Sequence, residues 1–391
     1  MLAWRAMRSS WMDVVLWMRL APVLVGIGCV GEPAAPDDAL EVESAAVSRH
    51  DGRWTRLATT GPAPSERSTP AVAAIGPMVY VFGGARDDSV TGDTQIYDDL
   101  HRLDTVKRRW DVLTPAGAKP PPRVFAASAA HAASRRMLVF GGAFFGPFFS
   151  DFSAYGDLWA YDVDDNRWTE LQASNAGPSP RSRPSAWVVD DKLYIFGGVT
   201  SFFQVLNDLW VYDLRANRWT ELIPVGAAGS PPPRHEAMIG SRGGRLILYG
   251  GESIDDQFQF TVLDDTWELA VASRTWKNVT PAPGDNVAPP RNYGTAVAIG
   301  DSLYLQGGDT PVGVDCGPFP QHPTRELWRF DLRDRVWTQQ FPGGDPLVRL
   351  KRINSARVAG SMYVFGGYDF VCDDGVTPRQ IWNHDVYRFT P

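Results

Sequence analysis

An arginine recurs along the chain, each time after a proline-rich segment and before a run of small residues. A guanidinium group carries a planar fork of N–H donors, which binds carboxylates or phosphates through paired hydrogen bonds. If the surrounding segments are equivalent, the six side chains form a ring that could bind an anionic ligand. Alternatively, each guanidinium holds carbonyl or carboxylate groups of a neighbouring loop, and an unpaired subset alone would bind ligand. These residues are Arg67, Arg123, Arg181, Arg234, Arg291 and Arg352.

Phenylalanines form a second group of residues that could bind a ligand. The stretch "AFFGPFFSDFSAYG" (143–156) is rich in aromatic residues, and a pair follows in the next variable segment. Exposed aromatic surface typically marks an interaction site and suits a protein partner or a sugar ring. The alternative is that these rings pack on one another as a cap beneath a long loop. The candidates are Phe144, Phe145, Phe148, Phe149, Phe202 and Phe203.

Both groups fall within a unit that repeats six times. Residues 207–222 ("NDLWVYDLRANRWTEL") match residues 156–171 ("GDLWAYDVDDNRWTEL") at 11 of 16 positions. Each unit also contains a Gly-Gly pair, and successive pairs are 53 to 59 residues apart. The pairs are Gly83-Gly84, Gly141-Gly142, Gly197-Gly198, Gly250-Gly251, Gly307-Gly308 and Gly366-Gly367.

Each unit predicts four β-strands. The apolar runs before Gly-Gly, such as "MVYVFGG", are continuous, which is typical of strands buried on both faces. Segments rich in Ala, Gly and Ser precede them, and a "DLWVYD" and "RWTEL" hairpin follows. Four-stranded units of this length bury their faces only against neighbours, so the sequence predicts an all-β, six-bladed propeller. The sixth unit lacks its Trp strand, and "RWTRL" (53–57) is expected to complete that blade.

With these repeats, the chain resembles the kelch-repeat family over residues 50–391. The combination of Gly-Gly, an aromatic strand and a Trp strand carries the resemblance, whereas the shorter period of WD repeats does not match. The resemblance implies that binding groups gather on the face formed by the loops between the second and third strands and the connections between blades. The arginines and phenylalanines both fall on that face.

Composition restricts the class of partner. The net charge is -7, and lysine and arginine are scattered, so the basic patch of a nucleic-acid-binding protein is missing. We therefore expect a monomer that binds a protein or a glycan. Three cysteines are too few for paired zinc-ligand spacings.

The first residues resemble an export signal. Residues 1–28 contain arginines followed by the apolar stretch "LAPVLVGIG", the order found in secretory signals. "VGIGCV" is similar to a bacterial lipoprotein signal and implies a lipid on Cys29, although Gly26 stands where that family prefers Leu. Residues 29–49 are rich in Pro, Ala and acids, which is typical of a flexible tether. We expect a protein of the cell envelope that meets the membrane through a lipid anchor, or alternatively a soluble exported protein.

Export also bears on the remaining cysteines. Cys316 and Cys372 follow the Gly-Gly pairs of neighbouring units by eight and five residues. Disulfides persist in oxidising compartments, so we expect a bond between them that joins two long loops.

Enzymatic alternatives come from relatives of the fold. Copper oxidases resembling galactose oxidase need two Tyr, two His and a Cys at the axis, whereas His235, His322 and His384 are the histidines near the variable face. Relatives that use ferrous iron carry Glu, Asp and His four residues apart, and here Phe260 replaces the histidine after Glu252 and Asp256. A relative of the sialic acid mutarotases needs only placed acid–base groups, which the six arginines together with Glu252 or His235 could supply.

No catalytic residues are assigned, and no cofactor or metal is predicted. Calcium is kept as an alternative, because carboxylates suit hard cations. Its candidate ligands are Asp315, Asp369, Asp373 and Asp374, together with His322 and His384. The sequence favours a non-catalytic binding scaffold over a carbohydrate enzyme of the same fold.

Overall fold

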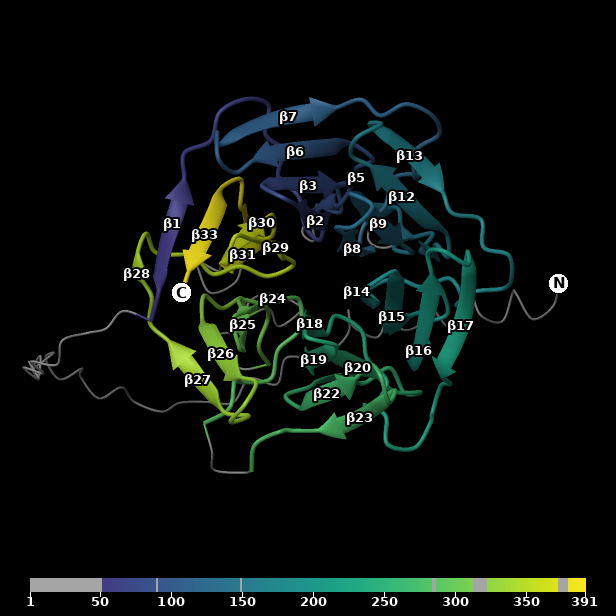
Figure 1. Ribbon diagram of the computed structural model, residues 1–391. Helices are drawn as coiled ribbons and strands as arrows, with labels where there is room; N and C mark the ends of the chain where they lie inside the picture. The colour runs from purple at the N-terminus through teal and green to yellow at the C-terminus, as the bar shows by residue number, and fades with distance from the viewer. Residues whose placement is uncertain (1–50, 89–90, 148–149, 283–285, 312–321, 372–378) are drawn as a thin grey trace, which may run out of the picture. The chain divides into compact units, whose positions relative to one another are not determined.

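The six repeats form six sheets around one axis, as Figure 1 shows. A computed structural model describes residues 51–88, 91–147, 150–282, 286–311, 322–371 and 379–391. Each blade is built from four antiparallel strands, which confirms the predicted six-bladed all-β propeller. Among these described residues, no helix has the length and apolar character needed to cross a membrane.

The strands of each blade follow one another from the axis outward. Blades one and two consist of β2 (Ala71–Ile75), β3 (Met78–Phe82), β6 (Leu100–Asp104) and β7 (Arg109–Leu113), then β8 (Ala127–His131), β9 (Arg136–Phe140), β12 (Leu158–Asp162) and β13 (Arg167–Glu170). Blades three and four consist of β14 (Ser185–Val189), β15 (Lys192–Val199), β16 (Val205–Asp213) and β17 (Arg218–Ile223), then β18 (Met238–Arg242), β19 (Arg245–Tyr249), β22 (Thr266–Ala270) and β23 (Thr275–Asn278). Blade five consists of β24 (Thr295–Ile299), β25 (Ser302–Gln306), β26 (Leu327–Asp331) and β27 (Trp337–Gln340).

The N-terminal strand closes blade six, as predicted. The blade consists of β29 (Asn354–Val358), β30 (Ser361–Phe365), β33 (Val386–Thr390) and β1 (Arg53–Leu57). β1 pairs antiparallel with β33, and the two-residue β28 (Gly343–Gly344) runs parallel to β1 on its other side. Arg56 also forms an ion pair with Asp385 at 2.8 Å. The ring is therefore closed by backbone hydrogen bonds between the two ends of the propeller.

The Trp strands join adjacent blades. Trp168 of blade two lies 5.0 Å from the ring of Phe82 in blade one, and Trp219 of blade three lies 5.5 Å from Phe140 in blade two. Each indole fills the space between two sheets, where aromatic side chains contribute large buried areas. The repeated Trp is thus part of the scaffold.

Glycine is required where one blade approaches the next. Gly84 has φ +90°, and its N–H donates to the carbonyl of Arg123 in the following blade. A Cβ on Gly83 would lie 2.7 Å from that same carbonyl oxygen. The Gly-Gly pair therefore serves close packing between blades.

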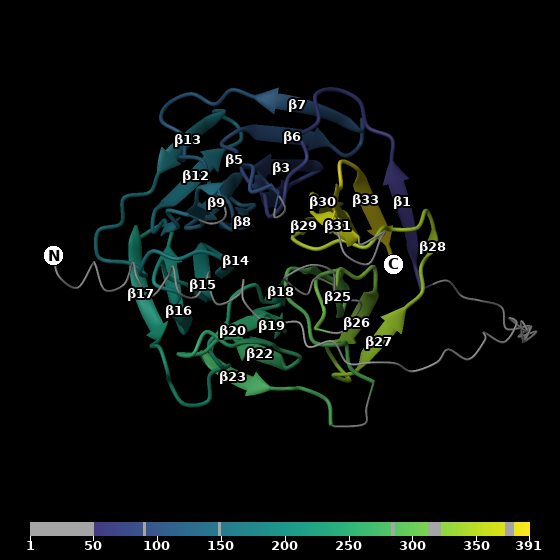
Figure 2. The same cartoon turned by 180° about the vertical axis from the view of Figure 1, so that it is seen from behind.

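Short hairpins extend from the second and third strands on one face of the propeller; β5, β20 and β31 of these hairpins are labelled in Figure 2. They are β4 (Ala85–Asp87) with β5 (Thr94–Ile96), β10 (Ala143–Phe144) with β11 (Ser153–Ala154), β20 (Glu252–Ile254) with β21 (Phe260–Val262), and β31 (Tyr368–Val371) with β32 (Arg379–Trp382). In blade three, the extended ends of β15 and β16 take the same place.

Candidate functional site

Five of the six arginines are buried and hold a carboxylate. In blade three, Arg181 Nη1 donates to Asp208 Oδ1 at 2.6 Å, and Nη2 donates to Oδ2 at 2.9 Å. Arg181 also donates to the carbonyls of Gly197 and Ser179. Equivalent pairs join the inner connection of four other blades to the segment around the start of the third strand. They are Arg67–Asp99, Arg123–Asp157, Arg234–Asp265 and Arg291–Glu326.

These pairs support the structural alternative for the five arginines. Burial alone would raise the pKa of Asp157, but Arg123 and the indole N–H of Trp159 lower it below its usual value. The carboxylate is thus held ionised against a buried guanidinium. In blades two to five a Trp stands two residues after the acid, and its indole N–H donates to the same carboxylate.

Arg352 is not the sixth member of this ring, and the prediction of six equivalent arginines is wrong there. Leu350 takes the equivalent place, because its carbonyl accepts the N–H of Gly308 as the arginine carbonyls do in other blades. Arg352 lies two residues further on, where its Nη1 donates to Asp87 Oδ2 of blade one at 2.6 Å.

Arg352 instead belongs to a second ring, directly around the axis, which sequence analysis missed. At one equivalent position in each blade, two residues after the first ring, the backbone is left-handed, with φ between 43° and 59°. The N–H of Arg352 donates to the carbonyl of Tyr293 at 2.8 Å, and the N–H of Thr69 donates to that of Arg352 at 2.8 Å. This conformation is uncommon for residues other than glycine and is found where surrounding structure imposes it. The members are Thr69, Phe125, Arg183, Glu236, Tyr293 and Arg352.

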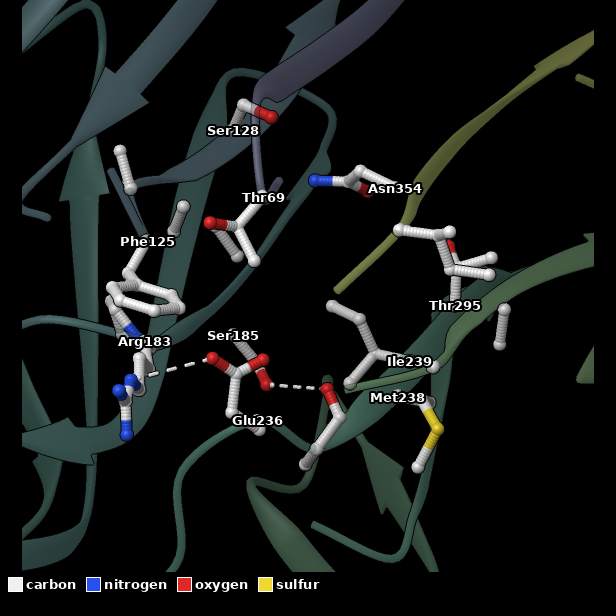
Figure 3. A pocket seen from close by; sticks show the side chains of 18 residues that line it. Thr69, Phe125, Ser128, Arg183, Ser185, Glu236, Met238, Ile239, Thr295 and Asn354 are labelled. Atoms are coloured by element: carbon white, nitrogen blue, oxygen red, sulfur yellow. Dashed lines mark hydrogen bonds and ion pairs between the residues drawn. The ribbon is translucent and has the colours of Figure 1, made fainter. Parts of the chain in front are cut away.

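A cavity of about 140 Å³ lies on the axis beside this ring. Figure 3 shows Arg183 and Glu236 directed toward one another at its edge, with Arg183 Nε 3.5 Å from Glu236 Oε1. The Arg183 guanidinium also lies 4.2 Å from the centre of the Phe125 ring, a cation–π contact. Ser128 and Asn354 are among the polar side chains around the cavity. The charged groups that reach this cavity are therefore paired with each other.

Blades four to six share a buried polar cluster between neighbouring loops. Asn292 Nδ2 donates to Glu252 Oε1 at 3.0 Å, which joins blade five to blade four. Lys351 of blade six forms an ion pair with Asp309 of blade five. His235 Nε2 lies 3.6 Å from Glu252 Oε2. We call these five residues the polar cluster.

Blades one to three carry small or apolar residues at the corresponding positions. The first ring consists of the five paired arginines and Leu350. In every blade, the residue after this first-ring position forms an antiparallel β-bridge with the residue after the Gly-Gly pair. In blades four to six these pairs are His235–Glu252, Asn292–Asp309 and Lys351–Tyr368. In blades one to three they are Ser68–Ala85, Val124–Ala143 and Ser182–Val199.

Burial shifts the protonation of the polar cluster. It raises the pKa of Glu252 to about 7, although the charge of Arg183 opposes the shift. It lowers the pKa of Lys351 to about 8, against the attraction of Asp309. Burial and the charge of Arg183 together lower the pKa of His235 well below its usual range, so its ring is neutral. The cluster is held by hydrogen bonds and one ion pair between loops.

The acid–base candidates lie beneath the loops. His235 is 1% exposed and Glu252 is 8% exposed, so neither presents its side chain to a ligand at the surface. His322 is also buried, and its Nδ1 lies 2.9 Å from the carbonyl of Thr310. His384 is exposed, and its Nδ1 lies 3.9 Å from Glu66 Oε1. This arrangement gives the buried histidines a role in loop packing.

The carboxylates considered as calcium ligands are a separate set of residues. In the part of the chain that the structure describes, no group of three or more His, Cys, Asp or Glu side chains is placed to hold a metal ion. The calcium candidates Asp315, Asp373 and Asp374 lie outside the described residues, and Asp369 forms an ion pair with Arg349. Calcium therefore stays an alternative drawn from the sequence.

The phenylalanines divide into buried and exposed residues. Phe145 is 2% exposed and packs against Phe125, so its place on a ligand-binding surface is corrected to packing. Phe144 is 41% exposed. Phe148 and Phe149 lie outside the described residues, as do Cys29, Cys316 and Cys372.

The other rings form an aromatic patch across three blades. Phe152 of blade two stacks on Phe203 of blade three at 5.5 Å, and Phe203 meets Phe258 of blade four edge-on at 6.5 Å. Phe202 is 90% exposed, Phe258 is 58% exposed and Phe260 is 62% exposed. We call these five residues the aromatic patch. Phe258 and Phe260 were not among the predicted site residues.

Two hairpin tips hold the patch in a fixed conformation. Phe203 and Phe258 have φ 60° and 58°, and each N–H donates to the carbonyl three residues earlier. The Thr200 hydroxyl accepts the N–H groups of Phe202 and Gln204. In blade four, Asp255 Oδ1 accepts the N–H groups of Gln257 and Gln259 in the same way. A bulky residue in the left-handed region carries strain of about 1 to 2 kcal/mol, so both tips expose aromatic rings at a cost to stability.

Comparison with known proteins identifies the family to which the repeats belong. The family model described as "KLHDC2/KLHL20/DRC7 Kelch-repeats domain" matches residues 71–308. The chain belongs to the kelch-repeat family. The resemblance stated from the sequence is thereby confirmed for the repeats.

Several curated proteins are similar to this kelch chain. Leucine-zipper-like transcriptional regulator 1 homolog of Drosophila melanogaster is 26% identical over 348 residues, covering 86% of this chain and 32% of the relative. Host cell factor 1 of Homo sapiens is 29% identical over 367 residues, covering 85% and 16%. The flagellar outer arm dynein alpha chain of Chlamydomonas reinhardtii is 30% identical over 248 residues, covering 59% and 5%. The chain therefore spans at most about a third of the length of these relatives.

Proposed function

We propose that this propeller is a binding scaffold that captures a protein partner on the face formed by its variable loops. The observation that carries the proposal is the aromatic patch, which exposes phenylalanines on adjacent blades. Burying one such side chain in an interface contributes about 1.5 to 3 kcal/mol. Aromatic residues are also enriched among the residues that dominate binding energies.

Three further features support this function over catalysis at the same face. The first-ring arginines are paired with carboxylates, which leaves them a structural role. The acid–base candidates His235 and Glu252 are buried. The patch is also held by side-chain hydrogen bonds at both hairpin tips, and a rigid surface loses little entropy on binding.

Photo-cross-linking in cells that produce the protein tests this function. A benzoylphenylalanine replaces Phe202 in one variant and Val106 in another, which is 77% exposed in the turn between β6 and β7 on the opposite face. We expect a discrete protein adduct from position 202 that is lost when Phe260→Ser is added. No adduct at position 202, or the same adducts at both positions, would contradict the proposal.

The location of the scaffold is proposed from the sequence alone. We propose export to the cell envelope, with a lipid on Cys29 and residues 29–49 as a tether that holds a monomeric propeller near the membrane. Cys29→Ser should move the protein from the detergent phase to the aqueous phase on phase separation. An unchanged distribution, or mature protein without a lipid mass, would contradict the anchor. A glycan ligand is the alternative to a protein at the aromatic patch.

A further inference from the structure

The surroundings of the aromatic patch are acidic. Asp151, Asp255, Asp256 and Asp264 are all exposed on the hairpins that carry the rings or beside them. The segments 141–157, 197–208 and 250–265 contain no Lys, Arg or His. The side chains that are charged on these segments at neutral pH are therefore all negative. An acid that burial keeps protonated adds no charge.

The neighbouring connections do not offset this charge. The segments 171–180 and 223–233, which lie between blades two and four, carry no ionisable side chain. The basic residues that directly follow these two connections, Arg181, Arg183 and Arg234, are buried or largely buried and belong to the two rings. A ligand on the patch thus meets apolar rings and carboxylates, with no exposed cation contributed by these segments.

We propose that the aromatic patch takes a short segment of a partner protein that is both apolar and basic. This inference rests on the proposed function and names the chemistry of the partner. Apolar side chains of the segment cover Phe202, Phe258 and Phe260, and lysine or arginine side chains face Asp151, Asp256 and Asp264. Complementary charge at the rim raises the association rate and selects among partners, while buried aromatic rings supply most of the affinity.

The same charges disfavour other occupants. An anionic membrane surface attracts basic segments and would be repelled by these carboxylates. A second copy of this chain would bring an equally acidic face against the first. A phosphate backbone would meet the same repulsion.

Peptide binding to the full-length protein tests the inference. The probe is a fluorescent peptide of alternating leucine and lysine, and the comparison peptide has glutamate in place of lysine. We expect the leucine–lysine peptide to bind at least about tenfold more tightly, and to lose about tenfold in affinity between about 50 mM and 500 mM salt.

Matched variants locate the binding. Phe202→Ser with Phe260→Ser should weaken the leucine–lysine peptide by about tenfold or more, and Asp256→Lys by about threefold. Two controls lie elsewhere: Phe341→Ser removes a phenylalanine that is 68% exposed in blade five, and Asp165→Lys reverses an exposed acid in the turn between β12 and β13. Both controls should stay within about twofold of the unmodified protein.

The outcomes separate this inference from the proposed function. Equal binding of the two peptides, no binding of either, or equal losses in the patch and control variants would overturn the basic segment. If the cross-link from position 202 nevertheless forms and maps to a neutral or acidic segment, protein binding stands and the basic partner is wrong. If no cross-link forms, the proposed function itself is wrong.

Discussion

Blades one to three and blades four to six differ at one structural position. The bridge beside the first ring pairs small or apolar residues in the first half, such as Val124 with Ala143. In the second half it pairs ionisable or amide side chains, such as His235 with Glu252. The polar half is buried and joined across blades, whereas the exposed rings lie on the hairpins of blades two to four. The ionisable side chains of the polar cluster thus hold the loops together, whereas the phenylalanines of the aromatic patch form the accessible surface.

Both halves rest on the same arginine–carboxylate scaffold. Arg181→Ala would leave Asp208 buried without its cation and should lower the free energy of unfolding by about 4 kcal/mol. Arg291→Ala in blade five should cost a similar amount, because Glu326 is then unpaired. Urea denaturation of both variants provides the measurement. A large difference between them would show that the two halves are not equivalent scaffolds.

The polar half should depend on its ion pair. Lys351→Met removes the buried cation that faces Asp309 and should cost about 3 kcal/mol. Ser182→Ala, at the equivalent place in blade three, should cost less than about 1 kcal/mol, because its hydroxyl has no hydrogen-bond partner among the described residues. Adding Asp309→Asn to Lys351→Met should restore part of the loss. Equal costs at positions 351 and 182 would remove the distinction between the halves.

Glu252 should make the polar half sensitive to pH. Its pKa rises from the usual 4.5 to about 7 on folding, so the folded protein binds more protons than the unfolded chain between these values. Stability therefore falls as pH rises from about 4.5 to about 7. Glu252→Gln keeps the oxygen that accepts from Asn292 and removes the charge. The variant should match the unmodified protein at pH 5 and exceed it by about 2 kcal/mol at pH 8.

Thermal denaturation at the two pH values checks this. A variant that is less stable than the unmodified protein at pH 8 would show that ionised Glu252 stabilises the loops through its neighbours.

The aromatic patch should contribute little to folding. Phe202 is 90% exposed, so Phe202→Ser should change the free energy of unfolding by less than about 0.5 kcal/mol. Phe145→Ser, one blade away, should cost about 3 kcal/mol because that ring is buried. Similar costs for both would mean that Phe202 also packs in the core of the face.

The scaffold could be predicted from the sequence because its signals are local and recur. The Gly-Gly pairs recur every 53 to 59 residues, and in five blades the acid stands 11 residues before the Trp of the outermost strand. The absent sixth Trp strand pointed to residues 53–57. The face was predicted less well. "LVRLKRI" offers two arginines near the expected position, and the structure places Leu350 there instead. In "AFFG", nothing in the pattern separates exposed Phe144 from buried Phe145, since their positions depend on the neighbouring blade.

Cross-linking from two exposed phenylalanines in different blades tests the central claim most directly. Benzoylphenylalanine is placed at position 202 in blade three or at position 341 in blade five, both of which hold exposed phenylalanines. In cells that produce the protein, a partner adduct should form from position 202 and not from position 341. Adducts from position 341 alone, or equal adducts from both, would contradict a binding surface on blades two to four.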